Sequence, residues 1–222
     1  MANDPTTPDR AIEAVIWDFG GVFTSSPFHA IATHADELGV DVKVIAALIF
    51  GDYGADTDHP WHRLERGEIS FEQAGELIDA EAIAQGVDLT LQQAMGAIAG
   101  AGGAGVCADM PELVREVRAS GLRTGLLTNN LVEIRDLWRP LLPLDELFDD
   151  VVDSSEVGLR KPDPAIYLLA CGRLGGVDPE AVIFLDDAES NVEAAREVGM
   201  IGLVVTYGDP HVRDEVRSLI AH

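Results

Sequence analysis

The chain has 222 residues, 47% of them apolar, which is enough for one sizeable domain or for a core domain that carries a small insert. Its formal net charge of −24 argues against binding to nucleic acid or to an anionic membrane surface, because polyanions select clustered lysine and arginine. The two distant cysteines, the lack of a secretory signal at the N-terminus and the lack of an apolar run of about 18 residues favour a cytoplasmic protein.

The first predicted strand follows a polar beginning of the chain. Residues 1–10 are polar and rich in proline, which predicts a flexible N-terminal tail. The apolar run Ala14–Trp17 comes next, ends at Asp18 and is followed by Gly20 and Gly21. A short apolar run bounded by glycines is typical of a strand that is buried on both faces of a parallel sheet.

The block from residue 24 to residue 105 has a different pattern. It shows helical periodicity without a clear buried strand, and its helices are predicted at 28–38, 42–50, 71–84 and 89–99. A Gly/Ala-rich connection at 100–105 leads back to the strand pattern. We therefore predict a helical insert at 24–105.

From residue 106 onward, predicted strands alternate with predicted helices. The strands are expected at 122–127, 151–152, 181–185 and 201–205, and the helices at 111–120, with Asp109 as its N-cap, at 163–174 and at 190–198. This alternation indicates an α/β fold, in which a parallel sheet lies between two layers of helices. The core is predicted to consist of residues 11–23 and 106–222.

Three of the predicted strands end in polar residues, namely Asp18, Thr128 and the pair Asp186-Asp187. The carboxyl ends of parallel strands meet at one edge of the sheet, where ligands bind in α/β proteins. One such carboxylate is as easily a helix cap, but three polar strand ends in one chain favour a functional site.

Four runs of the sequence resemble, in order and in spacing, the motifs of the haloacid dehalogenase superfamily. They are Val15–Val22, Leu126–Asn129, Arg160–Asp163, and Phe184–Asp187 with Asn191. The resemblance covers about residues 12–207 and implies a three-layer, Rossmann-like core whose helical insert is the small cap of the family. Within the superfamily, the chain resembles the phosphatase-like N-terminal domains of epoxide hydrolases. It is similarly close to stand-alone sugar-phosphate phosphatases that carry the cap string Arg-Gly-Glu-Ile-Ser, which appears here as Arg66–Ser70.

The resemblance implies a Mg²⁺-dependent phosphatase. Asp18 is then the nucleophile that forms an aspartyl-phosphate, which divides one difficult step into two. Asp18, the backbone carbonyl of Gly20 and Asp187 are expected to hold Mg²⁺, a cation that prefers oxygen ligands, with Asp186 as a ligand or a supporting residue. Asn191 is expected to orient the acidic loop.

The remaining site residues are assigned by the same resemblance. Lys161 is expected to supply a fixed positive charge, and Thr128 to donate its hydroxyl to a phosphoryl oxygen. Asn129, through its backbone N–H, and the loop residues Gly20 and Gly21 are expected to bind the substrate.

One position departs from the usual pattern. Most phosphatases of the family carry a second aspartate two positions after the nucleophile, where this chain has Gly20, and a positioned acid contributes roughly 10²–10⁴ in rate. Three outcomes stay open: substrates with good leaving groups, an acid from the cap such as His62 or Glu65, or a protein that binds phosphate with little catalysis. The similar sugar-phosphate phosphatases also have glycine here, which favours the first outcome.

Other residues of the insert have two interpretations each. Arg63 and Arg66 would bind a second anionic group of the substrate or pair with neighbouring glutamates. Trp61 and Phe28 would line a substrate pocket or, more commonly for such residues, belong to the core.

Two other chemistries of the superfamily fit less well. Dehalogenases of this type lack paired aspartates like Asp186-Asp187, and a phosphonate-cleaving enzyme would need a cap lysine, where only Lys43 occurs, without a flanking motif. We therefore expect hydrolysis of a small phosphomonoester by a monomer or homodimer, and the alternative is a catalytically weak phosphate-binding or regulatory protein.

Overall fold

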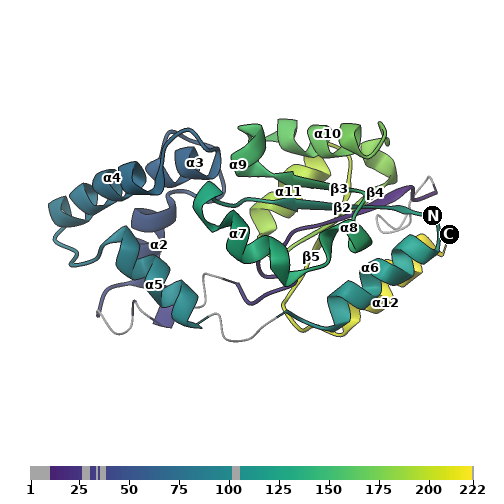
Figure 1. Cartoon of the computed structure of the whole chain (residues 1–222), viewed down its shortest axis with the longest axis horizontal. Helices are drawn as coiled ribbons and strands as arrows, with labels where there is room; N and C mark the ends of the chain where they lie inside the picture. The colour runs from purple at the N-terminus through teal and green to yellow at the C-terminus, as the bar shows by residue number, and fades with distance from the viewer. Residues whose placement is uncertain (1–10, 27–30, 34, 36–38, 102–105, 222) are drawn as a thin grey trace, which may run out of the picture.

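A computed structural model of the chain describes residues 11–26, 31–33, 35, 39–101 and 106–221 (Figure 1). The predicted tail at 1–10, most of the predicted helix at 28–38 and most of the glycine-rich connection at 100–105 lie outside the described residues.

A parallel sheet forms the centre of the core, as predicted. Within the described residues it has five strands in the order β3-β2-β1-β4-β5, with the bounds β1 (Ala14–Trp17), β2 (Arg123–Thr128), β3 (Asp150–Asp153), β4 (Val182–Asp186) and β5 (Ile201–Val204). In the central strand, Trp17 is in register with Leu126 of β2 and with Leu185 of β4. The residue after Trp17 therefore leaves the sheet between the carboxyl ends of β2 and β4.

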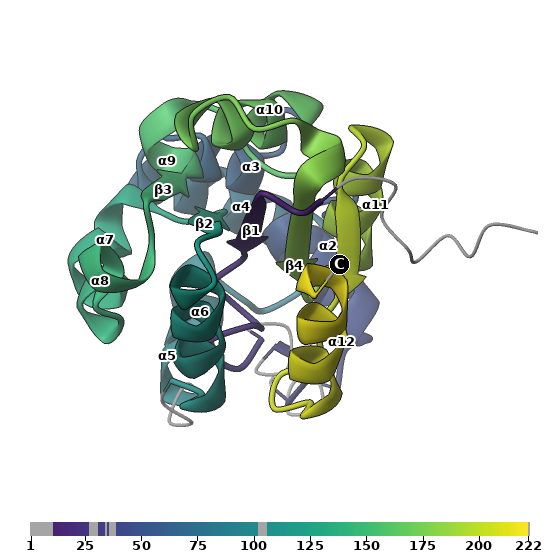
Figure 2. The same cartoon turned by 90° about the vertical axis from the view of Figure 1, so that its right-hand side faces the viewer.

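Helices cover both faces of the sheet and give the predicted three-layer α/β fold (Figure 2). The core helices are α6 (Asp109–Ala119), α7 (Arg135–Trp138), α8 (Leu144–Leu147), α9 (Ser154–Val157), α10 (Pro164–Arg173), α11 (Glu189–Glu197) and α12 (His211–Ile220). Three short 3₁₀ turns accompany them at Val132–Ile134, Arg139–Leu141 and Pro179–Ala181.

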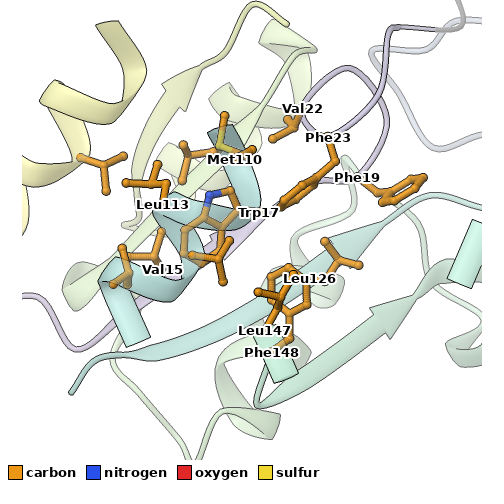
Figure 3. Packing of buried hydrophobic residues seen from close by; sticks show 14 of the residues in the cluster. Val15, Trp17, Phe19, Val22, Phe23, Met110, Leu113, Leu126, Leu147 and Phe148 are labelled. Atoms are coloured by element: carbon orange, nitrogen blue, oxygen red, sulfur yellow. The ribbon is translucent and has the colours of Figure 1, made fainter. Parts of the chain in front are cut away.

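Both faces of β1 are buried, which explains its uninterrupted apolar sequence. Val15 and Trp17 belong to the cluster that includes residues of α6 and α12, whereas Ala14 and Ile16 belong to the cluster on the α10 and α11 side. Successive side chains of a strand point to opposite faces, so each face needs its own apolar residues. The fully buried Trp17 is the last residue of β1 and packs against Phe148 with 6.1 Å between ring centroids (Figure 3). This packing holds the end of the strand in place directly before Asp18.

The described part of the insert is helical and has its own apolar cluster. Its helices are α2 (Val42–Phe50), α3 (Pro60–Glu65), α4 (Phe71–Ala84) and α5 (Leu91–Ala101). Ile45, Ile49, Leu64 and Ile78 are among its buried residues, and Figure 1 shows the four helices together at one end of the molecule. We call this part the cap. The boundaries of the cap at 24 and 105 stay a prediction.

The predicted helices at 42–50 and 71–84 are confirmed, and the others that the structure describes end within a few residues of their predicted bounds. The capping box of Ser70 and Gln73 explains the start of α4. Asp109 as an N-cap is wrong, because α6 begins at Asp109 and the preceding Ala108 has no side chain to accept a hydrogen bond. Along the described residues, no helix combines the length and the apolar character that a membrane crossing requires.

Candidate active site

Asp18 lies at the carboxyl end of the central strand. Its backbone N–H donates to the carbonyl of Leu185 at 2.8 Å, which continues the ladder between β1 and β4 by one residue. Its side chain is largely buried, and one carboxylate oxygen lies 2.7 Å from the Nζ atom of Lys161. The structure therefore joins two of the predicted catalytic residues in one ion pair.

Lys161 is held at both of its ends. Its side chain is 1% exposed, and its Nζ donates to Asp18 at 2.7 Å, to Asp186 at 2.6 Å and to the carbonyl of Leu127 at 2.9 Å. These bonds use all three donors of the ammonium group. The side chain of Asn129 holds the lysine backbone, because its Oδ1 accepts from the Lys161 N–H at 2.8 Å and its Nδ2 donates to the Lys161 carbonyl at 2.9 Å.

The side-chain role of Asn129 was missing from the sequence prediction, which used only its backbone N–H. The bond partners are 32 residues apart in the chain, and the sequence carries no signal that would pair them. The structure does not test whether the backbone N–H binds a substrate.

Asp186 is fully buried and bonded on both oxygens. Oδ1 accepts from the N–H of Ala188 at 2.8 Å and from Asn191 at 3.0 Å, and Oδ2 accepts from Lys161 at 2.6 Å and from Asn191 at 3.1 Å. Asn191 thus orients the acidic loop, as the sequence predicts. The backbone carbonyl of Asn191 in turn accepts the hydroxyl of Tyr167 at 2.9 Å.

The carboxylates of Asp18, Asp186 and Asp187 converge, with one oxygen from each within 4.8 Å of the others. Burial raises the pKa of Asp18 to about 8; nearby Lys161 lowers it, and the two other aspartates raise it. Burial and then the charge of Asp186 raise the pKa of Asp187 to about 6, opposed by a hydrogen bond from Ser26. One ammonium does not balance three carboxylates at this distance.

This donor set fits a hard divalent cation. Carboxylate oxygens are the ligands that Mg²⁺ prefers, and a cation at this point would offset both the burial and the repulsion that raise the pKa values of Asp18 and Asp187. Since the oxygens of Asp186 already accept bonds from Lys161, Asn191 and Ala188, the oxygens of Asp18 and Asp187 are the better candidates for metal ligands.

The two glycines after the nucleophile differ in what surrounds them. A Cβ atom at Gly21 would lie 2.0 Å from Oδ2 of Asp187, and the φ angle of +76° also favours glycine. Only glycine therefore lets the loop pass so close to the acidic pair. A Cβ atom at Gly20 would meet nothing within 4 Å, so the lack of an aspartate at position 20 is not imposed by crowding.

Thr128 ends β2 and is buried beside this edge of the sheet. Its hydroxyl makes one long bond, 3.4 Å to the carbonyl of Asn129. Such a bond is weak, so this hydroxyl is suited to donate to a bound oxygen instead.

The cap approaches the core next to Lys161. Arg160, fully buried, donates from Nε to Glu65 of α3 at 2.7 Å and from Nη1 to the carbonyl of Ala55 at 2.9 Å. The hydroxyl of Ser154 also donates to the carbonyl of Glu65 at 2.7 Å. The sequence pattern predicted no role for Arg160, although this residue stands directly before Lys161.

The two cap residues proposed as the missing acid, His62 and Glu65, are both buried and bonded to other residues. The ring of His62 is bonded within the cap, with Nε2 at 2.8 Å from the carbonyl of Phe50 and Nδ1 at 2.9 Å from the hydroxyl of Thr57. Burial and the charge of Arg160 lower the pKa of His62 to about 4, so the ring is neutral at pH 7. Burial raises the pKa of Glu65, while its partner Arg160 lowers it.

Arg63 and Arg66 pair with carboxylates of the cap, and Trp61 belongs to its apolar core. Arg66 pairs with Asp56 and, at 2.6 Å, with Glu68, and Arg63 lies 3.4 Å from Glu68. Trp61 is buried in the apolar cluster of the cap. Phe28 lies outside the described residues.

Comparison with known proteins identifies the class to which this fold and site belong. The sequence profile of the haloacid dehalogenase-like hydrolases matches residues 12–199, and the chain belongs to this family of hydrolases.

Several curated relatives are longer proteins. The chain is 32% identical to acyl-CoA dehydrogenase family member 10 of Mus musculus over 92% of its own length but 19% of that protein. It is 26% identical to bifunctional epoxide hydrolase 2 of Rattus norvegicus over 88% of this chain and 36% of the relative. A sesquiterpene phosphatase of Aspergillus oryzae is 28% identical and matches over 87% of this chain and 90% of its own length.

Solved structures with this fold include different chemistries. A HAD family enzyme of Bacteroides thetaiotaomicron, crystallised with magnesium and inorganic phosphate, has a TM-score of 0.60 at 19% identity, with 91% of this chain and 99% of that chain covered. An L-2-haloacid dehalogenase has a TM-score of 0.66 at 18% identity, with coverage of 96% and 100%. At these identities the likeness concerns the fold alone.

Proposed function

We propose that the protein hydrolyses a small phosphomonoester in a Mg²⁺-dependent reaction, with Asp18 as the nucleophile. The observation that carries the proposal is the ion pair of Asp18 and Lys161 at 2.7 Å, beside two further carboxylates that suit a divalent cation. A buried carboxylate, a fixed ammonium and a metal site at one point provide the charge neutralisation that attack on a phosphate ester needs.

The proposed reaction has two steps. A carboxylate oxygen of Asp18 attacks phosphorus and the bond to the ester oxygen breaks, which forms an aspartyl-phosphate and releases the leaving group as an oxyanion that takes up a proton from solvent. Water then attacks the same phosphorus atom and gives up one proton to solvent, the bond between phosphorus and the Asp18 oxygen breaks, phosphate leaves and the carboxylate is regenerated. Bound Mg²⁺ would supply positive charge for the phosphoryl oxygens, with Asp18 and Asp187 as ligands and Asp186 as the residue that holds Lys161.

Gly20 directs the proposal toward esters with good leaving groups. Without a carboxylate at this position, the departing oxygen lacks the acid that other family phosphatases use. Anomeric sugar phosphates, acyl phosphates and aryl phosphates need less protonation, so we expect rates that rise steeply as the leaving-group pKa falls.

The relatives support this choice of reaction. One relative that matches nearly the whole chain is named as a sesquiterpene phosphatase, and one structural neighbour was crystallised with magnesium and phosphate. The paired aspartates 186 and 187 also favour a metal-dependent phosphatase over a dehalogenase.

The experiment is phosphate release from a panel of phosphomonoesters, with Mg²⁺ and with EDTA. Turnover should require Mg²⁺ and should fall by about 10³-fold or more in Asp18→Asn. Asp88→Asn, an exposed residue in the loop before α5, makes the same charge change away from the site and should keep the wild-type rate. If the panel is hydrolysed equally well by Asp18→Asn, Asp18 is not the nucleophile.

A phosphate-binding or regulatory protein is the second candidate, and glycine at position 20 is the observation that favours it. Calorimetry with Mg²⁺ and inorganic phosphate would then show binding while the ester panel shows no turnover. A cytoplasmic location and a monomeric or homodimeric state stay predictions.

A further inference from the structure

The loop between α2 and α3, residues 51–59, lies against both sides of the proposed site. Its Ala55 carbonyl accepts from Arg160, the residue before Lys161. On the other side, a Cβ atom at Gly54 would lie 3.7 Å from Cβ of Ser190, three residues after Asp187. These contacts hold the loop between Arg160 and Ser190, which flank Lys161 and Asp187 in the chain, so an ester bound at Asp18 would extend toward the loop and the end of α3.

The cations at this place are already neutralised. Arg160 is bonded to Glu65 at 2.7 Å and lies 3.8 Å from Asp56. Arg66 pairs with Asp56 and Glu68, so that these two arginines face three carboxylates. Lys161 has no donor to spare after its bonds to Asp18, Asp186 and the carbonyl of Leu127.

The other basic residues of the cap do not change this balance. Between positions 24 and 105 the lysines and arginines of the sequence are Lys43, Arg63 and Arg66. Lys43 is exposed near the start of α2, roughly 12 Å along the helix from Gly51 at 1.5 Å per residue. Arg63 is partly exposed and lies 3.4 Å from Glu68.

One donor beside the loop suits a neutral acceptor. Nη2 of Arg160 is buried and has no hydrogen-bond partner among the residues that the structure describes, although the guanidinium as a whole is neutralised by carboxylates. The guanidinium carbon of Arg160 lies over the ring of Tyr53, 5.3 Å from its centroid. A hydroxyl or carbonyl oxygen would satisfy such an N–H without adding charge.

From these contacts we propose that the substrate carries its phosphate as its one charged group, and that its organic part is neutral and bears hydroxyl or carbonyl oxygens. This inference rests on the proposed function and narrows its substrate class. A second phosphate or a carboxylate on the organic part would lie against Glu65 and Asp56, with no unpaired cation beside it among the residues that the structure describes, and like charges at close range are unfavourable.

The test compares two aryl phosphates that differ in one charge: 4-(carbamoylmethyl)phenyl phosphate and 4-(carboxymethyl)phenyl phosphate. The methylene group separates the charge from the ring, so the two phenols leave with similar ease. We expect kcat/KM to favour the neutral ester by about tenfold or more. Equal rates, or a preference for the carboxylate, would overturn the proposal.

Variants test whether the carboxylates of the cap cause the selection. Asp56→Asn and Glu65→Gln each remove one charge beside Arg160 and should narrow the preference by about threefold or more. Glu76→Gln, at an exposed position on α4, makes the same charge change elsewhere and should leave the ratio as it is. A ratio that stays at the wild-type value in both site variants would refute the role given to these acids.

Binding separates this inference from the proposed function. Benzylphosphonates lack the scissile P–O bond, so calorimetry of 4-carbamoylbenzylphosphonate and 4-carboxybenzylphosphonate with the Mg²⁺-loaded protein reports selection without turnover. Tighter binding of the neutral compound supports the inference even if no ester is hydrolysed. Tighter or equal binding of the carboxylate contradicts it even if esters are hydrolysed.

Discussion

Replacement of Asp187 by asparagine should stabilise the metal-free protein and remove its response to Mg²⁺. Burial and the charge of Asp186 raise the pKa of Asp187 from 3.8 to about 6. One pKa unit corresponds to 1.36 kcal/mol, so this shift means that ionised Asp187 destabilises the folded state by about 3 kcal/mol at pH 7.5. Because Asp187 is partly exposed and solvent screens its charge, we expect a gain of about 1–2 kcal/mol in Asp187→Asn.

The sign follows from the raised pKa. The unfolded chain ionises this group near pH 4 and the folded chain near pH 6, so stability is lost as pH rises through this window. The gain from Asp187→Asn should therefore be small at pH 4 and complete above pH 6.

Thermal unfolding at pH 7.5 measures both effects. In EDTA the variant should melt about 2–8 °C above the wild type, since 1 kcal/mol corresponds to about 2–4 °C in a domain of this size. In Mg²⁺ at about 100 times its dissociation constant, the wild type should gain about 2.7 kcal/mol and the variant little, which reverses the order. A variant that is less stable in EDTA, or that gains as much from Mg²⁺ as the wild type, would refute the reasoning.

Three further substitutions have defined outcomes. A side chain at position 20 would enter open space, so Gly20→Asp should raise the rate of alkyl phosphate hydrolysis by about 10²-fold or more. It should also make the hydrolysis rate depend less on the pKa of the leaving group. Unchanged rates with alkyl phosphates would contradict the proposed lack of an acid. Glu65→Ala removes the carboxylate that pairs with buried Arg160 and should lower the free energy of unfolding, measured in urea, by about 3–5 kcal/mol. A loss of less than about 1 kcal/mol would show that the pair does not stabilise the fold. Gly21→Ala brings a methyl group into the position of the Asp187 carboxylate, at a positive φ angle that strains alanine, and should weaken Mg²⁺ binding as measured by calorimetry. An unchanged affinity for Mg²⁺ would contradict this prediction.

Much of the fold follows from local patterns in the sequence. The apolar run of β1 predicted a strand buried on both faces, and the polar residues at the ends of β1, β2 and β4 predicted the edge at which Asp18 and the acidic pair meet. These predictions succeed because burial of a parallel strand dictates its composition, whatever lies elsewhere in the chain.

The contacts between cap and core were not predictable in the same way. Glu65 and Arg160 are separated by 95 residues, and either charge taken alone has the pattern of a solvated surface residue. α3 was also missed, because it is six residues long and its start is marked by Pro60 within a polar stretch. Short elements that depend on tertiary contacts give little periodicity to detect.

The packing of β1 also limits how the sequence around the nucleophile is able to change. A deletion within Ala14–Trp17 would draw Asp18 back by one residue, about 3.3 Å, and would turn its side chain toward the other face of the sheet. The same deletion would exchange the residues that face α6 with those that face α10, so a tryptophan would enter the space of an isoleucine. Substitutions in this strand are therefore more easily accepted during divergence than changes in its length.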